Sequence, residues 1–198
     1  MANQKETKKE AILKAAKALF WRHGLRRVSI VEICAKAKVS KMTFYKYFAN
    51  KEILAEYLIT EMLTDWHNEY RTVMSSDLAF TKKINQVIVL EQSASQNMSE
   101  EFLKDIYNNE FVYLQQLINN YRDTYHTEIV NDMVEAQKNG QVRTDIKPEF
   151  ILYLLEDIGN KVMDEKLSKM YPSKQALILE LSNYFFYGII NTTNENIT

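Results

Sequence analysis

Residues that interrupt helices are scarce in this sequence. Its 198 residues include only four glycines and two prolines. Because both residues disfavour helix interiors, their scarcity favours long helical segments. A chain of this length can hold one sizeable core, or a small domain beside a larger one. We therefore expect an almost entirely helical protein.

Cysteines and long apolar runs are also scarce. The single cysteine, Cys34, excludes an intrachain disulfide and fits a reducing compartment. No apolar run approaches the roughly 20 residues needed to cross a bilayer. The lysine-rich N-terminal segment is not followed by the apolar stretch of a signal peptide. These absences predict a cytoplasmic protein with no membrane partner.

Side-chain patterns typical of metal sites and catalysis are missing as well. His23, His67 and His126 are scattered, and none has the spacing of metal ligands. Neither a glycine-rich phosphate loop nor a nucleophile elbow occurs. The sequence therefore predicts no metal, no cofactor and no catalytic residue.

Charge is distributed unevenly along the chain. Residues 1–56 contain 13 Lys and Arg against 5 Asp and Glu, a net charge of +8, whereas residues 57–198 carry a net −9. The near-neutral total of −1 thus conceals a basic N-terminal segment and an acidic remainder. This asymmetry indicates a polyanionic partner at one end only.

Residues 40–48 form a short helical pattern with two different faces. Phe44, Tyr47 and Phe48 fall at i, i+3 and i+4, so they make an aromatic face that can pack on a core. Met42 and Lys46 project from the other side. Such a face suits a DNA major groove, where lysines and hydroxyls contact phosphates and the remaining side chains contact base edges. An ordinary core helix with a solvated lysine face is the alternative.

Two further helical patterns precede this segment. One covers residues 6–23 and ends at Gly24, and the second begins at Ser29. The residues Ala37, Lys38 and Val39 then turn the chain into the helix of residues 40–48. Helix, short turn and helix form the layout of a helix-turn-helix unit.

Residues 29–48, followed by Asn50-Lys51-Glu52-Ile53-Leu54, resemble the DNA-binding region of the tetracycline-repressor (TetR) family. The family pattern is a helix, the turn Ala-Gly-Val-Ser, a recognition helix with Tyr-x-x-Phe, and a Lys-Glu-x-Leu start to the next helix. Two residues depart from it. Lys38 stands where the turn usually has glycine, so a left-handed backbone there costs about 1 kcal/mol more. Met42 replaces a typically small residue in the reading face.

From this resemblance we expect a three-helix DNA-binding domain over residues 1–50 and a larger helical domain over residues 51–198, with about nine helices in all. The resemblance also implies double-stranded DNA with a palindromic operator as the expected partner. The residues expected to face bases are Lys41, Met42, Thr43 and Lys46, and those expected to hold phosphates are Ser29, Ser40, Tyr45, Tyr47 and Lys51.

The remaining sequence continues in helical periodicity. We expect helices over residues 51–74, 78–95 and 110–139, a short helix near Phe102, and two closing helices that begin near Pro148 and Pro172. The closing helices carry wide apolar stripes, which predict a homodimer through a four-helix bundle. The alternative is that both stripes complete the core of a single chain. The expected interface residues are Ile151, Leu154, Leu155, Ile158, Val162, Leu177, Leu181, Tyr184, Phe185 and Gly188.

Aromatic residues and methionines are frequent beyond the basic segment. Twelve Tyr and eight Met in the chain can line an adaptable apolar cavity with hydroxyl groups. In the resembled family such a cavity binds a small-molecule effector that shifts the DNA-binding domains. By that resemblance the candidate ligand residues are Trp66, Tyr70, Glu91, Gln92, Tyr107, Phe111 and Tyr125. For any single one of them, ordinary core or surface packing is the alternative.

These observations predict a ligand-responsive transcriptional repressor that is released from its operator by a small molecule, and not an enzyme. Two alternatives remain open. One is a DNA-binding dimer without an effector, and the other is a helical enzyme acting on a small molecule. The identity of the effector and the operator sequence do not follow from these residues.

Overall fold

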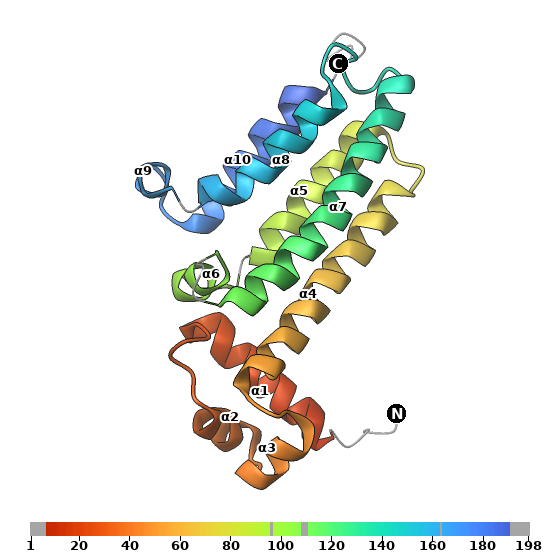
Figure 1. Ribbon diagram of the computed structural model, residues 1–198. Helices are drawn as coiled ribbons and strands as arrows, with labels where there is room; N and C mark the ends of the chain where they lie inside the picture. The colour runs from red at the N-terminus through yellow and green to blue at the C-terminus, as the bar shows by residue number, and fades with distance from the viewer. Residues whose placement is uncertain (1–6, 96, 108–110, 163, 191–198) are drawn as a thin grey trace. The chain divides into compact units, whose positions relative to one another are not determined.

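The computed structural model describes residues 7–95, 97–107, 111–162 and 164–190 (Figure 1). Within them the chain forms ten helices, α1 to α10, and one isolated antiparallel bridge between Val142 and Ile190. The expected all-α fold is thereby confirmed. By its contacts the chain divides into two compact units. The first contains Met1–Thr64 and Asn97–Leu117, and the second contains Asp65–Gln96 and Ile118–Thr198.

The first three helices form around short capping signals. Helix α1 spans Lys8–His23, α2 spans Ile30–Ala37 and α3 spans Lys41–Tyr47. Thr7 and Ser29 cap α1 and α2 in capping boxes with the glutamates three residues later. Ser40 caps α3 by accepting a hydrogen bond from the Thr43 N–H. The expected helix, turn and helix are present at the expected residues.

The turn between α2 and α3 has the left-handed residue that the sequence predicts. Lys38 has φ 55° and ψ 43°, and among the described residues it alone has a positive φ without being glycine. Its N–H donates to the Ala35 carbonyl and the following Val39 N–H donates to the Cys34 carbonyl. These bonds close the end of α2 despite the strain of a side chain at this position.

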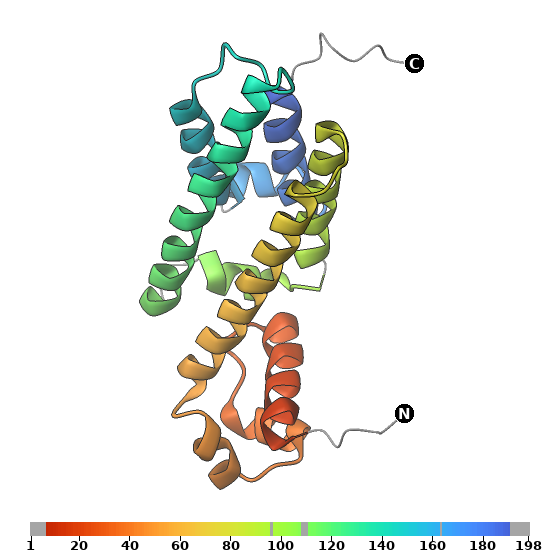
Figure 2. The same ribbon diagram turned by 90° about the vertical axis from the view of Figure 1, so that its right-hand side faces the viewer.

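Helices α4 and α6 also contribute to the first unit. Helix α4, Lys51–Met74, begins there and appears beside α1 in the turned view (Figure 2). Helix α6, Glu100–Tyr107, packs on α1, and the rings of Trp21 and Phe102 stack with centroids 4.3 Å apart. The core of this unit is made of side chains that are almost completely buried, namely Ile12, Ala16, Phe20, Leu25, Ile33, Phe44, Leu54, Leu58, Ile59 and Phe102.

The second unit surrounds a larger core. It contains the end of α4, α5 (Phe80–Ser95), most of α7 (Val112–Lys138), α8 (Pro148–Val162), α9 (Glu165–Ser168) and α10 (Lys174–Ile189). Helix α10 packs on both α5 and α8. The single turn α9 has no apolar periodicity of its own and was not expected. The buried Lys174 ammonium donates to the Val162 carbonyl at 2.9 Å, which satisfies a main-chain acceptor at the end of α8.

The grouping of α6 with the first three helices was not foreseen. The unit boundaries follow contacts between residues and not their roles, so the division at residue 50 into DNA-binding and effector-binding domains stays a prediction. None of the helices in the described part of the chain is long and apolar enough to span a membrane.

Candidate nucleic-acid interface and ligand site

Helix α3 is fixed by its aromatic side chains and exposes its polar ones. Phe44 and Phe48 are buried, and their rings contact each other and those of Tyr45 and Tyr57 at centroid distances of 5.5–6.1 Å. Tyr47, which the spacing grouped with them, is instead 45% exposed. The helix therefore keeps its position through two phenylalanines and leaves the opposite face free.

The face of α3 expected to read bases is accessible. Met42 is 74% exposed, and Lys41 and Lys46 are exposed. Thr43 is half-buried, and its hydroxyl lies 3.0 Å from the Ser40 hydroxyl. A methionine that exposed gains little from packing within the chain. The exposed position of Met42 is suited to contact with another molecule. Because the surrounding helix face is basic, a polyanion is the partner that this face favours.

The residues expected to hold phosphates fall into two groups. Tyr45 and Tyr47 are exposed and project from α3. Ser29 and Ser40 are exposed at the first turns of α2 and α3, where phosphate oxygens can also approach main-chain N–H groups.

Lys51 differs from the other expected phosphate contacts. Its ammonium donates to the carbonyl oxygens of Leu25 at 2.7 Å and Val28 at 2.9 Å, and lies 3.4 Å from that of Arg26. An ammonium has three N–H donors, so the described contacts use its hydrogen-bonding capacity within the chain. The phosphate role of Lys51 remains a prediction that these contacts do not favour.

Three of the seven candidate ligand residues form one aromatic cluster in the second unit. The Trp66 ring stacks on Tyr70 with a 10° interplanar angle at 5.5 Å, and its centroid lies 4.3 Å from that of Tyr125. The Tyr70 hydroxyl donates to the Asp132 carboxylate at 2.7 Å. Burial, and then this hydrogen bond, raise the pKa of Tyr70 well above its usual range.

Two polar atoms of this cluster lack a partner. The indole Nε1 of Trp66 and the hydroxyl of Tyr125 are buried and have no hydrogen-bond partner among the described residues. An indole N–H is only a donor, so it requires an acceptor. Buried groups of this kind are normally paired, and an unpaired one in a folded protein needs an explanation, such as a bound molecule.

Carboxylates surround the same cluster. Glu128 pairs with His67 and lies 3.2 Å from the Arg71 guanidinium. Burial raises the pKa of Glu91 to about 7, and the charge of Glu91 is one of the causes that raise the pKa of Tyr125. Glu91 therefore belongs to the electrostatic environment of Tyr125, and its place in a ligand site stays a prediction.

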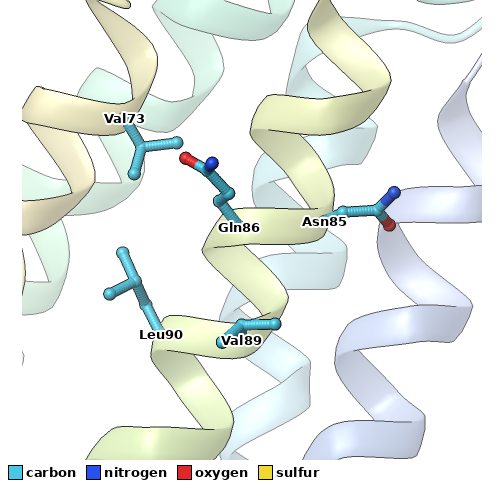
Figure 3. Close-up of a pocket in the computed structure, with 5 residues that line it drawn as sticks. All are labelled: Val73, Asn85, Gln86, Val89 and Leu90. Atoms are coloured by element: carbon cyan, nitrogen blue, oxygen red, sulfur yellow. The ribbon is translucent and has the colours of Figure 1, made fainter. Parts of the chain in front are cut away.

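The other ligand candidates are not gathered there. Gln92 is exposed on α5, and Phe111 is half-buried in the first unit, in edge contact with Tyr113. Tyr107 is the last residue of α6, and its side chain lies outside the described part. None of the seven candidates lines the shallow groove of about 320 Å³ between α4 and α5 (Figure 3).

That groove offers little chemistry. It is lined by Val73, Asn85, Gln86, Val89 and Leu90 (Figure 3). Asn85 points away from it toward α10, where its amide oxygen accepts a hydrogen bond from the Tyr187 hydroxyl. The lining has no charged side chain, so it lacks the convergent polar groups of a specific ligand site.

Some of the residues expected at the dimer interface are buried within the chain itself. Ile151, Val162, Leu177 and Phe185 are buried, as the single-chain alternative describes, so they offer no surface to a partner. Leu154, Leu155, Ile158 and Leu181 are half-buried. Tyr184 is 77% exposed, and a Cβ at Gly188 would meet no described atom within 4 Å apart from the neighbouring residues and the backbone of its own helix. The outward strip of α8 and α10 therefore consists of the half-buried residues together with Tyr184 and Gly188. It is narrower than the apolar stripes of the sequence predicted.

No group of three or more His, Cys, Asp or Glu in the described residues is arranged to hold a metal ion. His126 is a buried histidine that belongs to no such group, so burial of a histidine does not by itself indicate a metal site. Its Nδ1 is buried and has no hydrogen-bond partner among the residues that the structure describes, and burial lowers the pKa of His126 to about 4.

Comparison with known proteins finds similarity to bacterial regulatory proteins. Residues 12–58 match the family described as "Bacterial regulatory proteins, tetR family". The chain is 24% identical over 186 residues to the HTH-type transcriptional repressor KstR2 of Rhodococcus jostii, covering 85% of this chain and 89% of that protein.

Solved structures share the fold. A transcriptional regulator from Cytophaga hutchinsonii superposes with a TM-score of 0.72 at 16% identity, over 93% of this chain and 99% of that one. The regulator FadR from Bacillus subtilis, solved in complex with stearoyl-CoA, gives 0.68 at 17% identity, over 91% and 99%. These similarities show that the fold of this chain is shared with those proteins.

Proposed function

Because residues 12–58 match the tetR family of bacterial regulatory proteins, we propose that the chain belongs to this family and is a ligand-responsive transcriptional repressor. A homodimer binds a palindromic operator, and a small molecule bound in the second unit releases the homodimer from that operator. The observation that carries the DNA-binding part is helix α3. Two buried phenylalanines hold it, while Met42, Lys41 and Lys46 remain exposed.

Physical reasons favour DNA as the partner of this face. The first 56 residues carry a net charge of +8, which supplies the attraction to phosphates, and the acidic remainder disfavours binding through other surfaces. A single short helix reads too few base pairs to be selective. Two copies about one or a few helical turns apart give the selectivity that an operator requires.

Selection of bound sequences from random duplexes tests this proposal. We expect an inverted repeat whose half-sites are spaced by about one or a few helical turns, and binding that weakens steeply with salt. Recovery of no preferred sequence, together with the absence of binding at low ionic strength, would contradict the proposal.

The dimer is supported by the outward strip of α8 and α10. The exposed Tyr184, the open position at Gly188 and the half-buried leucines of α8 and α10 are suited to packing against a second copy. Replacing Tyr184 by Asp places a charge in this strip and should shift sedimentation toward the monomer. The matched control is Tyr57→Asp on α4, an exposed tyrosine outside the strip, which should leave the association state unchanged.

The effector is supported by the unpartnered atoms of Trp66 and Tyr125. Their rings are close enough for one small molecule to reach both atoms, and the donor-only indole requires a ligand with an acceptor oxygen. A ligand releases the operator only if it binds more tightly to the conformation that does not fit DNA. Helix α4 carries Trp66 and also begins at Lys51 in the first unit, so it is a physical route for such coupling.

Tryptophan fluorescence tests the effector site. The chain has two tryptophans, so a Trp21→Phe variant leaves Trp66 as the only one. Stearoyl-CoA, the ligand of a structural neighbour, is a reasonable first probe because its carbonyl and hydroxyl oxygens are acceptors. We expect saturable changes in emission that weaken in a Tyr125→Phe background. If neither stearoyl-CoA nor a wider ligand panel alters Trp66 emission, the DNA-binding dimer without an effector is the better description.

A further inference from the structure

The loop between α1 and α2 is held through its main chain by side chains from two other helices. The N–H groups of Leu25 and Arg26 donate to one carboxylate oxygen of Asp105 on α6, at 2.6 and 3.2 Å. The carbonyl of Leu25 accepts from the Lys51 ammonium on α4 at 2.7 Å. Leu25 is thus bound on its N–H by α6 and on its carbonyl by α4.

Gly24 makes this arrangement possible. It ends α1 with φ 80°, a conformation that side chains rarely adopt. A Cβ at this position would lie only 2.6 Å from the Asp105 carboxylate oxygen and 3.2 Å from the Cβ of Glu101. The close approach of α6 therefore depends on the absence of a side chain at residue 24.

Two further contacts join α6 and its N-terminal turn to α1. The Ser99 N–H donates to the Trp21 carbonyl at 2.7 Å, and the Trp21 ring stacks on Phe102. These contacts involve the end of α1, next to the loop that Asp105 binds. Helix α6 is therefore part of the structure that holds the DNA-reading helices.

The loop determines where α2 begins. Val28, whose carbonyl also accepts from Lys51, immediately precedes Ser29, the N-cap of α2. Helix α2 in turn packs on α3, the proposed reading helix. Hydrogen bonds that involve a charged group are stronger than neutral ones, so the charged side chains of Asp105 and Lys51 hold this loop more firmly than water would.

We propose that Asp105 and Lys51 are positioning residues for DNA binding, and that displacement of α6 against α4 alters operator affinity through the main chain of Leu25. This inference rests on the proposed function, because it concerns how the same DNA-reading helices are oriented. In this proposal neither residue contacts DNA. Without them the loop adopts several orientations, of which DNA binds one, and the affinity falls by the fraction of molecules in that orientation.

Substitution of Asp105 tests the α6 contact. Operator affinity is measured on the duplex selected by the unchanged protein and referred to the folded fraction measured by circular dichroism. We expect Asp105→Leu to bind about tenfold more weakly. Asp105→Asn keeps an acceptor oxygen and should lose only about threefold. Glu100→Gln removes the same charge from an exposed position of α6 and should bind like the unchanged protein.

Salt dependence distinguishes positioning from phosphate contact at Lys51. Loss of one phosphate contact lowers the slope of log affinity against log salt by about one. A positioning residue should lower the affinity and leave that slope unchanged. We therefore expect Lys51→Met to bind about tenfold more weakly with an unaltered slope, whereas a slope reduced by about one would overturn the role given to Lys51.

The outcomes separate this inference from the proposed function. An Asp105→Leu protein that binds the operator like the unchanged one would overturn the inference while DNA binding stands. An unchanged protein that binds no duplex would refute the proposed function itself. If Asp105→Leu does not fold, Gly24→Ala provides the second perturbation, since its Cβ displaces the carboxylate without removing it. A similar loss of affinity would support the inference, and full affinity would overturn it.

Discussion

Replacing Glu91 by glutamine should stabilise the protein at neutral pH and leave its stability unchanged in acid. Burial raises the pKa of this carboxyl from an ordinary 4.5 to about 7. The folded state therefore binds more protons than the unfolded state between these two values. It follows that the free energy of unfolding decreases as the pH rises through this window.

The size of the effect follows from the same two pKa values. Their difference corresponds to roughly 3 kcal/mol at most, since one pKa unit is worth about 1.4 kcal/mol. The loss of stability is absent below pH 4.5 and complete above pH 7. Glutamine keeps the size and the hydrogen-bonding groups of the side chain but does not ionise. The substitution therefore removes the loss of stability that accompanies ionisation of Glu91.

Urea unfolding at several pH values between 4.5 and 8 measures this difference. Glu91→Gln should match the unchanged protein near pH 4.5 and exceed its unfolding free energy by up to about 3 kcal/mol at pH 8. Glu69→Gln, on an exposed position of α4, is the matched control and should show no such dependence. A gain for Glu91→Gln that is the same at both ends of the range would refute the reasoning.

Three further substitutions have defined outcomes. Lys38→Gly removes the strain of a side chain in a left-handed conformation and should raise the unfolding free energy by about 1 kcal/mol. Lys36→Gly inside α2 should lower the unfolding free energy by about as much. Equal effects of the two substitutions in urea unfolding would contradict this reasoning. Met42→Ala should change base preferences in duplex selection while altering stability by less than about 0.5 kcal/mol, and unaltered preferences would exclude Met42 from the reading face. Tyr70→Phe should lower the unfolding free energy by about 1–3 kcal/mol, and by less in an Asp132→Asn background; additive losses would show that the hydrogen bond between Tyr70 and Asp132 contributes little.

Local signals predicted the helix-turn-helix well. The serines that cap α2 and α3, the spacing of Phe44 and Phe48, and the left-handed Lys38 all depend on residues within a few positions of each other. Short-range geometry of this kind is encoded in short stretches of sequence. The family resemblance rests on the same residues.

Contacts between distant segments were not predictable in the same way. Asp105 binds main-chain N–H groups some 80 residues away, and no side-chain pattern marks a main-chain partner. Similarly, the periodicity of α8 and α10 identifies an apolar face but not what covers it. Ile151 and Phe185 turned out to be buried in the chain's own core, whereas Tyr184 remains exposed.

The bridge between Val142 and Ile190 bears on how two copies would meet. With the hydrogen bond from the Arg143 N–H to the Ile189 carbonyl, it restrains the last turn of α10, beside Tyr184 and Gly188. A surface that is ordered before association loses little conformational entropy when a partner docks. Calorimetry of subunit dissociation should then give a heat-capacity change that scales with the apolar area exposed, without the additional contribution that accompanies coupled folding.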